Sequence, residues 1–313
     1  MEQVAQAPQQ RGRSRGFILG SLSLGHGASH LYDMGFPVFM EVIAKSLGLS
    51  YFQVATLFSI RQVGGGLVSL GGGALVDTLK SQWGLILTGC MAGSAVAYAF
   101  VGASTNFPLL ILAVILVSIP GALWHLPAAA ALSQRFPDRR GFAIAMHGFG
   151  SNIGNVLGPL MAGALLTILF WRHVLFIYAV PSLMLAGLVW WSLKDVGKEG
   201  DQEESVRFSE QLRIGLRLLR NPVVLGLILS ATLRGIGLNA LFHWTPFYLS
   251  DTDTGLGMSY FRAGFHYSLL AGMGIVSAPV LGLLSDKYGR KAVLVPGLAS
   301  AAVFSFLVVS TGD

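Results

Sequence analysis

The chain has 313 residues, of which 53% are hydrophobic and only 12% are charged, and its formal net charge is +6. Soluble domains carry about 25% charged residues, so this composition excludes a soluble globular protein and indicates a polytopic membrane protein. The single cysteine excludes an internal disulfide framework. Because the basic residues fall in short loops rather than on one face, a nucleic-acid partner is excluded as well.

Nine apolar segments are long enough to cross a bilayer, whose hydrocarbon core requires about 20 residues of helix. The predicted spans are 17–40, 51–76, 84–102, 108–133, 142–170, 174–193, 222–249, 265–285 and 292–310. With the N-terminus inside the cell, sixteen of the 21 lysines and arginines lie in inner segments, and only Lys45, Arg172 and Arg262 lie in outer loops. This bias predicts a cytoplasmic N-terminus.

A long connection separates six predicted spans from three. Its first part is acidic, which indicates a solvated linker, and from Phe208 on leucines recur on one helical stripe with arginines opposite. That pattern predicts an amphipathic helix on the inner leaflet, although a plain spacer between two bundles is an alternative. The predicted domains are a six-helix bundle (1–193), a cytoplasmic linker with this helix (194–221) and the first three helices of a second bundle (222–313).

The sequence repeats itself at an offset of 209 residues, since "SYF" at 50–52 recurs at 259–261. In the same register, the matched pairs are Pro37 with Pro246, Gly65 with Gly274, Gly73 with Gly282, Leu75 with Leu284, and Asp77 with Asp286. Two pseudo-symmetric six-span halves with a site between them are a known transporter architecture. We therefore expect twelve spans in a complete protein and a chain truncated after its ninth span; a true nine-span protein is the alternative.

The segment "GLLSDKYGRKAVL" (282–294) fits the pattern G-x-L-S-D-[KR]-x-G-R-[KR] throughout. In this segment the chain resembles the major facilitator superfamily of secondary transporters, which implies an all-α helical bundle with a central cavity. Asp286 lies beside basic residues at a predicted helix end, and Gly289 permits a tight turn, so such a cluster can latch one conformation. An ordinary positive-inside loop is the alternative. The expected latch consists of Gly282, Asp286, Lys287, Gly289, Arg290, Lys291 and, in the first half, Asp77.

A second segment, "RRGFAIAMHGFGSNIGNVLGPLMAG" (139–163), resembles the fifth-helix signature of drug–proton antiporters. Gly154, Gly158, Pro159 and Gly163 would give a small-residue packing face with a proline kink, although a generic packing face is an alternative. The arginine typical of the fourth span in that group is absent, with Val117 near its place. Proton-coupled efflux is therefore an expectation from resemblance.

Three shorter segments resemble the fosmidomycin-resistance group of exporters: "HLYDM" (30–34), "WHLP" (124–127) and "GSNIGNVLGP" (150–159). That group has a His-x-x-Asp pattern in its first span and a histidine before a proline in its fourth. His30, Asp33 and His125 match these places, but Leu126 separates His125 from Pro127. The resemblance does not identify a substrate.

Ionisable groups at membrane depth are costly and indicate function by default. His26, His30 and Asp33 are spaced to project from one helical face. Asp33 and Arg61 differ in depth by only about 5 Å on neighbouring spans, so we predict an ion pair between them. It would break during transport or, alternatively, be a fixed structural pair, whereas His26 is expected only to pack.

Histidines in the fourth and fifth spans are suited to a proton step, because an unperturbed imidazole titrates near pH 6.5. Simple packing is the alternative for each of them. In the repeat, Asn239 is the counterpart of His30 and Phe242 that of Asp33, so the acid is not duplicated. The predicted proton and substrate pathway is His30, Asp33, Arg61, His125, His147, Asn152, Arg234, Asn239 and His243.

These features predict a monomeric secondary transporter in a cell membrane, the bacterial inner membrane, that exports a small organic solute by proton-coupled alternating access. A proton-coupled importer of an organic anion is the alternative in the same fold. A non-transporting sensor, or a metal-binding membrane protein using His26, His30 and Asp33, are alternatives of other classes. No phosphate-binding loop or nucleophile elbow is present in the sequence, so we expect no enzyme, no cofactor and no metal.

Overall fold

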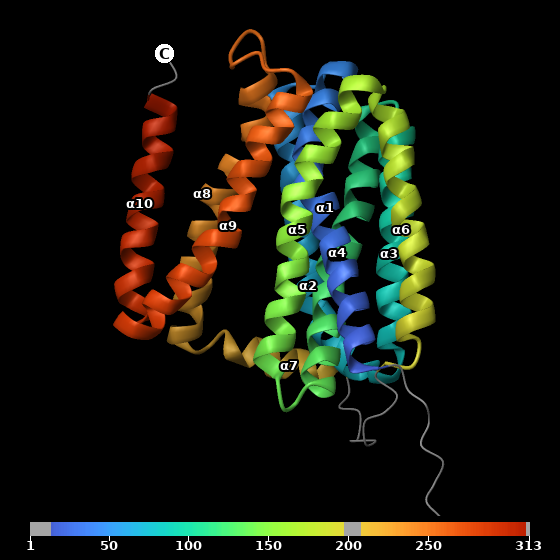
Figure 1. The fold of residues 1–313 in the computed structure, drawn as a ribbon, viewed down its shortest axis with the longest axis vertical. Helices are drawn as coiled ribbons and strands as arrows, with labels where there is room; N and C mark the ends of the chain where they lie inside the picture. The colour runs from blue at the N-terminus through green and yellow to red at the C-terminus, as the bar shows by residue number, and fades with distance from the viewer. Residues whose placement is uncertain (1–13, 197–207, 311–313) are drawn as a thin grey trace, which may run out of the picture.

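The computed structural model describes residues 14–196 and 208–310, which contain helices and short connections but no strand. Ten α-helices occur in these ranges (Figure 1). They are α1 Arg15–Leu47, α2 Tyr51–Thr78, α3 Trp83–Ala103, α4 Phe107–Arg135, α5 Arg140–Ile168, α6 Trp171–Leu193, α7 Phe208–Leu218, α8 Pro222–Ser250, α9 Tyr260–Tyr288 and α10 Arg290–Ser310, with a short 3₁₀ turn at Lys80–Gln82.

The repeat predicted from the sequence is visible in the helix boundaries. Helix α2 begins at Tyr51 after the N-cap Ser50, and α9 begins at Tyr260 after the N-cap Ser259, so both starts are 209 residues apart. Each serine hydroxyl accepts a hydrogen bond from a backbone N–H of the first turn, which satisfies a group that the helix cannot pair itself. The same local chemistry therefore starts the second helix of each half.

Seven of the described helices are long and apolar enough to cross a membrane by length and composition: α3 with the preceding turn, α4, α5, α6, α8, α9 and α10. Helices α1 and α2 are not among them, so the expected count of nine spans is not supported. The physical reason is their polar content, which includes His26, His30 and Asp33 in α1 and Arg61 in α2. The expected truncation after a ninth span is likewise not confirmed.

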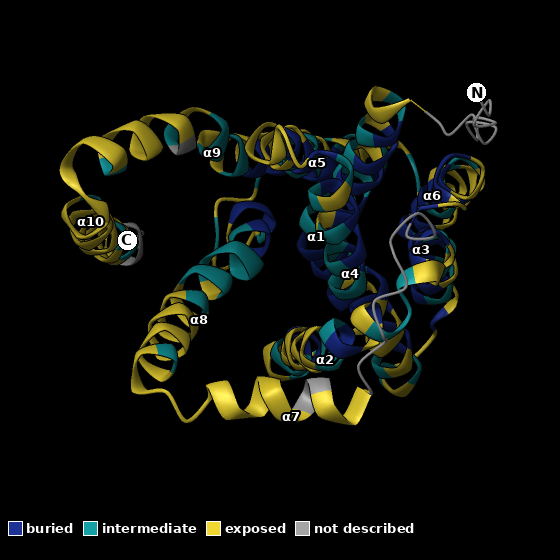
Figure 2. Cartoon of the chain, turned by 90° about the horizontal axis from the view of Figure 1, so that it is seen from below, coloured by how far each residue is buried: buried dark blue, intermediate teal, exposed yellow. Residues whose placement is uncertain are grey.

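Helix α5 is the central packing element, because it lies against α1 on one side and α9 on the other (Figures 1 and 2). A methyl group added to Gly154 would overlap the carbonyl oxygen of Gly27 in α1, and one added to Gly163 would overlap that of Tyr260 in α9. Small residues allow this close approach of backbones. The predicted small-residue face of α5 thus lies at two helix crossings rather than one.

Two apolar clusters fill the bundle formed by α1–α6. One contains Ile18, Leu22 and Trp124, and the other contains Tyr32, Phe36 and many residues near the opposite ends of the helices. On α1, the segment from His26 to His30 lies between the two clusters. The two histidines of α1 therefore lie at mid-height in the bundle, with apolar packing on both sides.

Helix α7 begins at Phe208, where the amphipathic helix was predicted, and lies across the end of the bundle at which α2 ends (Figure 1). It contacts α2, and its described side chains, such as Leu216, are exposed. Its position on the inner leaflet stays a prediction. The acidic part of the linker at 197–207 and the N-terminal arginines at 11 and 13 lie outside the described residues.

Candidate functional site

The structure contains the predicted ion pair between α1 and α2. Arg61 donates from Nη2 to Asp33 Oδ1, and its guanidinium carbon lies 4.7 Å from the centre of the Phe36 ring. Only 15% of the Arg61 side-chain surface and 32% of the Asp33 side-chain surface are exposed. The carboxylate and the aromatic face both stabilise the guanidinium, although Nε of Arg61 is buried without a hydrogen-bond partner. Whether the pair breaks during transport stays a prediction.

Four histidines from three helices gather beside this pair. The rings of His26 and His147 are stacked, with their centres 4.0 Å apart, and the ring of His125 lies 4.9 Å from that of His26. His30, one turn along α1, lies 4.7 Å from His26 and 5.6 Å from His125. His26 was expected only to pack, but it lies at the centre of this cluster.

Two of these rings have a defined hydrogen-bonding state. His26 Nδ1 lies 2.9 Å from the backbone carbonyl oxygen of His147, and His30 Nδ1 lies 2.9 Å from Oδ1 of Asn155. Because both oxygens can only accept, each Nδ1 carries the proton and donates it. In each neutral ring the lone pair is therefore on Nε2, and Nε2 of His26 is buried without a hydrogen-bond partner.

A cavity of about 390 Å³ lies between α2 and α4 and connects the two groups, since Asp33, Arg61 and His125 all line it. Gln62, Ser69 and Ser118 add polar lining, and Gly65 and Gly121 leave room for the opening. Asp33 Oδ1 would lie only 3.4 Å from a methyl group placed on Gly121, so the carboxylate faces α4 one turn before His125. A small polar solute in this cavity would meet a carboxylate, a guanidinium and an imidazole.

A second cavity, of about 580 Å³, lies between α2 and α8 and brings in the predicted residues of the second half. Asn239 and His243 line it, and the His243 ring stacks on Phe58 at 4.2 Å. Gln62 lines both cavities. Arg234 is exposed on α8 and lines neither of the two cavities, so the structure does not bring it to the site as the sequence suggested.

Comparison with known proteins decides the family. The sequence model of the Major Facilitator Superfamily matches residues 22–312. The chain belongs to this superfamily. It is 22% identical to the fosmidomycin resistance protein of Escherichia coli (strain K12) over 97% of this chain and 73% of that protein. It is 27% identical to an uncharacterized MFS-type transporter of Yersinia pseudotuberculosis serotype O:3 (strain YPIII) over 55% of this chain and 41% of that relative.

Solved structures of transporters share the fold. A bacterial homologue of the human lysosomal transporter Spinster, in an inward-facing and unoccupied conformation, superposes with a TM-score of 0.71 at 19% identity. The match covers 89% of this chain and 64% of the homologue, so the chain spans less than two thirds of its length. A peptide transporter POT in complex with alafosfalin gives a TM-score of 0.56 at 17% identity. The family and these neighbours are those of multi-pass membrane transporters rather than enzymes.

The superfamily motif at the end of α9 forms the tight turn that the sequence predicts. Gly289 caps α9 with φ 90° and ψ 151°, a backbone conformation that side chains with a Cβ rarely adopt, and α10 begins at the next residue. Asp286 and Lys287 are exposed near this turn, and Asp77 is exposed near the end of α2. The structure places these groups at helix ends on the same side of the molecule (Figure 1), and their action as a latch stays a prediction.

Sequence reasoning missed one residue that contacts the site and one buried residue near the end of α1. It selected Asn152, whereas Asn155, one turn further along α5, holds His30. It also passed over Glu41, which is buried in α1 and forms an ion pair with Lys45 at 2.6 Å, while Lys45 reaches the carbonyl of Ser250 in the second half. Asn155 belongs to the glycine-rich face of α5, so the periodicity of that face was the signal available for it.

Proposed function

We propose that this superfamily member is a secondary transporter that exports a small organic solute in exchange for protons by alternating access. The observation that carries the proposal is the cavity between α2 and α4, which is lined by the Asp33–Arg61 pair and His125 together. These groups lie at mid-height in the bundle, where transporters of this architecture bind substrate. Fosmidomycin is the first candidate substrate, because the curated relative that matches 97% of this chain is a fosmidomycin resistance protein.

Proton coupling is assigned to Asp33 in this proposal, with the histidines as its partners. Protonation of Asp33 would neutralise its charge and weaken its hold on Arg61, which would then be free to bind an anionic group of the solute. The histidine cluster begins with His125 on the wall of the same cavity and continues to His26 and His147. The imidazole of His125, on the cavity wall, would exchange a proton with a group in the cavity.

The proposed arrangement has the N-terminus in the cytoplasm, residues 1–193 as one bundle, 194–221 as a linker, and 222–313 as the beginning of the second bundle. The contacts between α1–α2 and α8 support two bodies that meet at one end. Lys45 bonds to Ser250, Tyr51 donates to Asp251, and the Tyr51 ring contacts Trp244. Asn152, Asn239 and His243 are proposed as solute contacts, the residues around Gly282–Lys291 and Asp77 as the latch, and the functional unit as a monomer.

The test uses the full chain in proteoliposomes with an imposed pH gradient and a pH-sensitive dye inside. Under the proposal, fosmidomycin added outside enters the proteoliposomes in exchange for protons that leave the lumen, which the dye records as a rise in internal pH. The Asp33→Asn variant should abolish this rise. Arg61→Gln should abolish it too, while Asp253→Asn, in an outer connection, should leave it unchanged. Co-uptake of solute and protons would instead identify an importer of an organic anion drawn to Arg61. Unchanged flux in both Asp33→Asn and Arg61→Gln would contradict a role of the pair in transport.

A further inference from the structure

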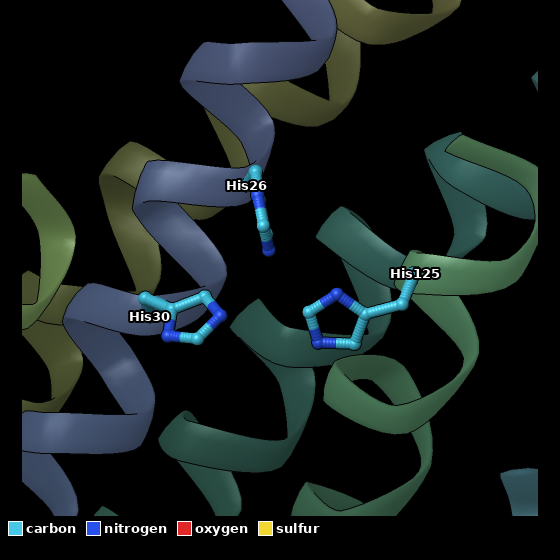
Figure 3. Close-up of side chains that lie close together, drawn as sticks. All are labelled: His26, His30 and His125. Atoms are coloured by element: carbon cyan, nitrogen blue, oxygen red, sulfur yellow. The ribbon is translucent and has the colours of Figure 1, made fainter. Parts of the chain in front are cut away.

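Three of the clustered histidines are close enough to share one bound ion. One ring nitrogen from each of His26, His30 and His125 lies within 4.8 Å of those of the other two. Figure 3 shows the three rings turned toward a common space, with His26 and His30 projecting from α1 and His125 from α4. The three ligand atoms therefore come from two helices that are packed together.

The hydrogen bonds of the cluster leave suitable lone pairs free. His26 donates from Nδ1 to the carbonyl of His147, and His30 donates from Nδ1 to Asn155. Histidines that bind metals typically donate their other ring N–H to a carbonyl or amide oxygen in this way, which fixes the tautomer and orients the ring. Nε2 of His26 is buried with no hydrogen-bond partner, a costly state for a polar atom unless something binds there.

We propose that His26, His30 and His125 form a binding site for one divalent transition-metal ion of the zinc type. Neutral imidazole nitrogens suit Zn²⁺, Ni²⁺, Cu²⁺ and Co²⁺, whereas Mg²⁺ and Ca²⁺ require oxygen ligands. Three protein nitrogens fill three of the four positions of a tetrahedral zinc site, and the fourth position is left for water or another ligand. The proposed site departs from the sequence expectation of no metal. It also differs from the alternative ligand set with Asp33, because Asp33 is paired with Arg61.

The geometry requires only a small closure of the site. Tetrahedral Zn–N bonds of about 2.1 Å place ligand nitrogens about 3.4 Å apart. The present separations of up to 4.8 Å would therefore contract by at most about 1.4 Å, which rotation of side chains on α1 and α4 can supply. His125 also lines the cavity of about 390 Å³ beside α2, so an ion in that cavity would meet this ligand first.

The direct test is equilibrium dialysis of the purified full chain against Zn²⁺, after affinity purification with a tag that contains no histidine. The expected result is one Zn²⁺ per chain. Loading with Co²⁺ should give the visible absorption of tetrahedral cobalt bound to nitrogen. Neither measurement needs a transported solute, so the metal site and the proposed transport function can fail independently.

Variants separate ligands from neighbours. His26→Ala, His30→Ala and His125→Ala should each weaken Zn²⁺ binding by more than the roughly 10–100-fold typical of losing a supporting hydrogen bond. Asn155→Ala, which removes only the acceptor for His30, should lie within that 10–100-fold range. His147→Ala keeps the backbone carbonyl that holds His26 and should change affinity less than Asn155→Ala. His173→Ala, an exposed histidine on α6, is the matched control and should not change it.

Folding is checked on the metal-free variants by gel filtration and thermal unfolding, so a loss of binding counts only where the chain elutes and melts as the parent does. If an alanine variant fails to fold, glutamine at the same position replaces it. Zn²⁺ binding that survives equally in all three ligand variants would overturn the proposal, as would the absence of stoichiometric Zn²⁺ from the parent chain. A loss as large in His173→Ala as in the ligand variants would also overturn it.

Discussion

The first two helices of each half share helix caps and proline positions, but they differ in their ionisable side chains. Helices α2 and α9 begin 209 residues apart with the same serine cap, and α1 and α8 each contain a proline at corresponding positions, Pro37 and Pro246. At the positions of Asp33 and Arg61, however, the second half has Phe242 and Leu270. The repeated helical scaffold therefore keeps its caps and prolines within this chain, while the Asp33–Arg61 pair and the cluster of four histidines belong to the first half alone.

The two regions also differ in burial (Figure 2). In the most apolar windows of α4 and α5, 39% of the residues are buried, compared with none in α8 and α10 and 6% in α9. The described part of the second half contacts the first mainly through α9 on α5 and through α8 near its end at Ser250. The first half thus has its own packed interior, and packing changes should cost more there than in α8–α10.

The largest effect is expected from breaking the ion pair that only the first half contains. Asp33→Asn should destabilise the chain by about 3 kcal/mol, at the low end for stranding a buried charge, because the Asp33 side chain keeps 32% of its surface exposed. Thermal unfolding in detergent measures this loss. The double variant Asp33→Asn with Arg61→Gln should recover much of the stability, since no charge is left without its partner. Equal stability of parent and single variant would contradict the pairing.

The crossing of α1 and α5 should be the next most sensitive feature. Gly154→Ala should cost about 1–3 kcal/mol, because the new methyl group would overlap the carbonyl of Gly27 and force the helices apart. Gly148→Ala, in the same helix with open space around it, is the control and should be near neutral. Thermal unfolding compares the two. A loss in the control as large as that at Gly154 would contradict the helix crossing as its cause, since helix propensity favours alanine over glycine.

The turn after α9 tests the framework of the second half. Gly289→Ala should cost about 1–2 kcal/mol because the residue has φ 90°, which a Cβ makes strained. At the corresponding place after α2 the first half has a 3₁₀ turn beginning at Lys80 instead. Gly297→Ala, inside α10 with nothing near, should be neutral or slightly stabilising. Identical unfolding temperatures for the two variants would refute the turn conformation.

A smaller difference is expected between α3 and α10. Tyr98 in α3 is buried and donates a hydrogen bond of 2.8 Å to the carbonyl of Tyr32, whereas Leu307 occupies the corresponding place in α10. Tyr98→Phe should cost about 1 kcal/mol by leaving that carbonyl without its side-chain donor. Tyr288→Phe, at an exposed tyrosine near the end of α9, provides the control. Unfolding midpoints that move equally in both variants would contradict a contribution from the buried bond.

The smallest effect concerns the end of α8 and depends on pH. Backbone N–H groups of Thr254 and Asp253 bond to the Asp251 carboxylate and hold its pKa below the usual value. A depressed folded-state pKa adds stability that is present above the unfolded pKa of about 3.9 and is lost as pH falls through the folded pKa. Asp251→Ala should therefore melt slightly lower than the parent at pH 6, and the difference should diminish as the pH is lowered into that range. A difference that grows on acidification would have the wrong sign.

Much of the fold could be predicted because it depends on local properties. Runs of apolar residues set the long helices, Ser50 and Ser259 cap two of them, and Gly289 supplies a backbone conformation that few other residues adopt. The pair of Asp33 and Arg61 could be predicted as well. They lie at similar depth on consecutive helices joined by a short loop, and opposite charges in an apolar bundle have strong reason to meet.

The sequence by itself therefore determined the membrane class, the helix order and the internal repeat. It also determined the Asp33–Arg61 ion pair, which follows from the similar depth of the two residues on consecutive helices. Only the tertiary structure decided that Asn155 rather than Asn152 faces His30, and that His125 joins two histidines of α1. These contacts depend on the rotation of each helix about its axis and on how closely two helices cross. Both are fixed by packing between residues far apart in the chain, such as Gly27 with Gly154, which no local pattern encodes.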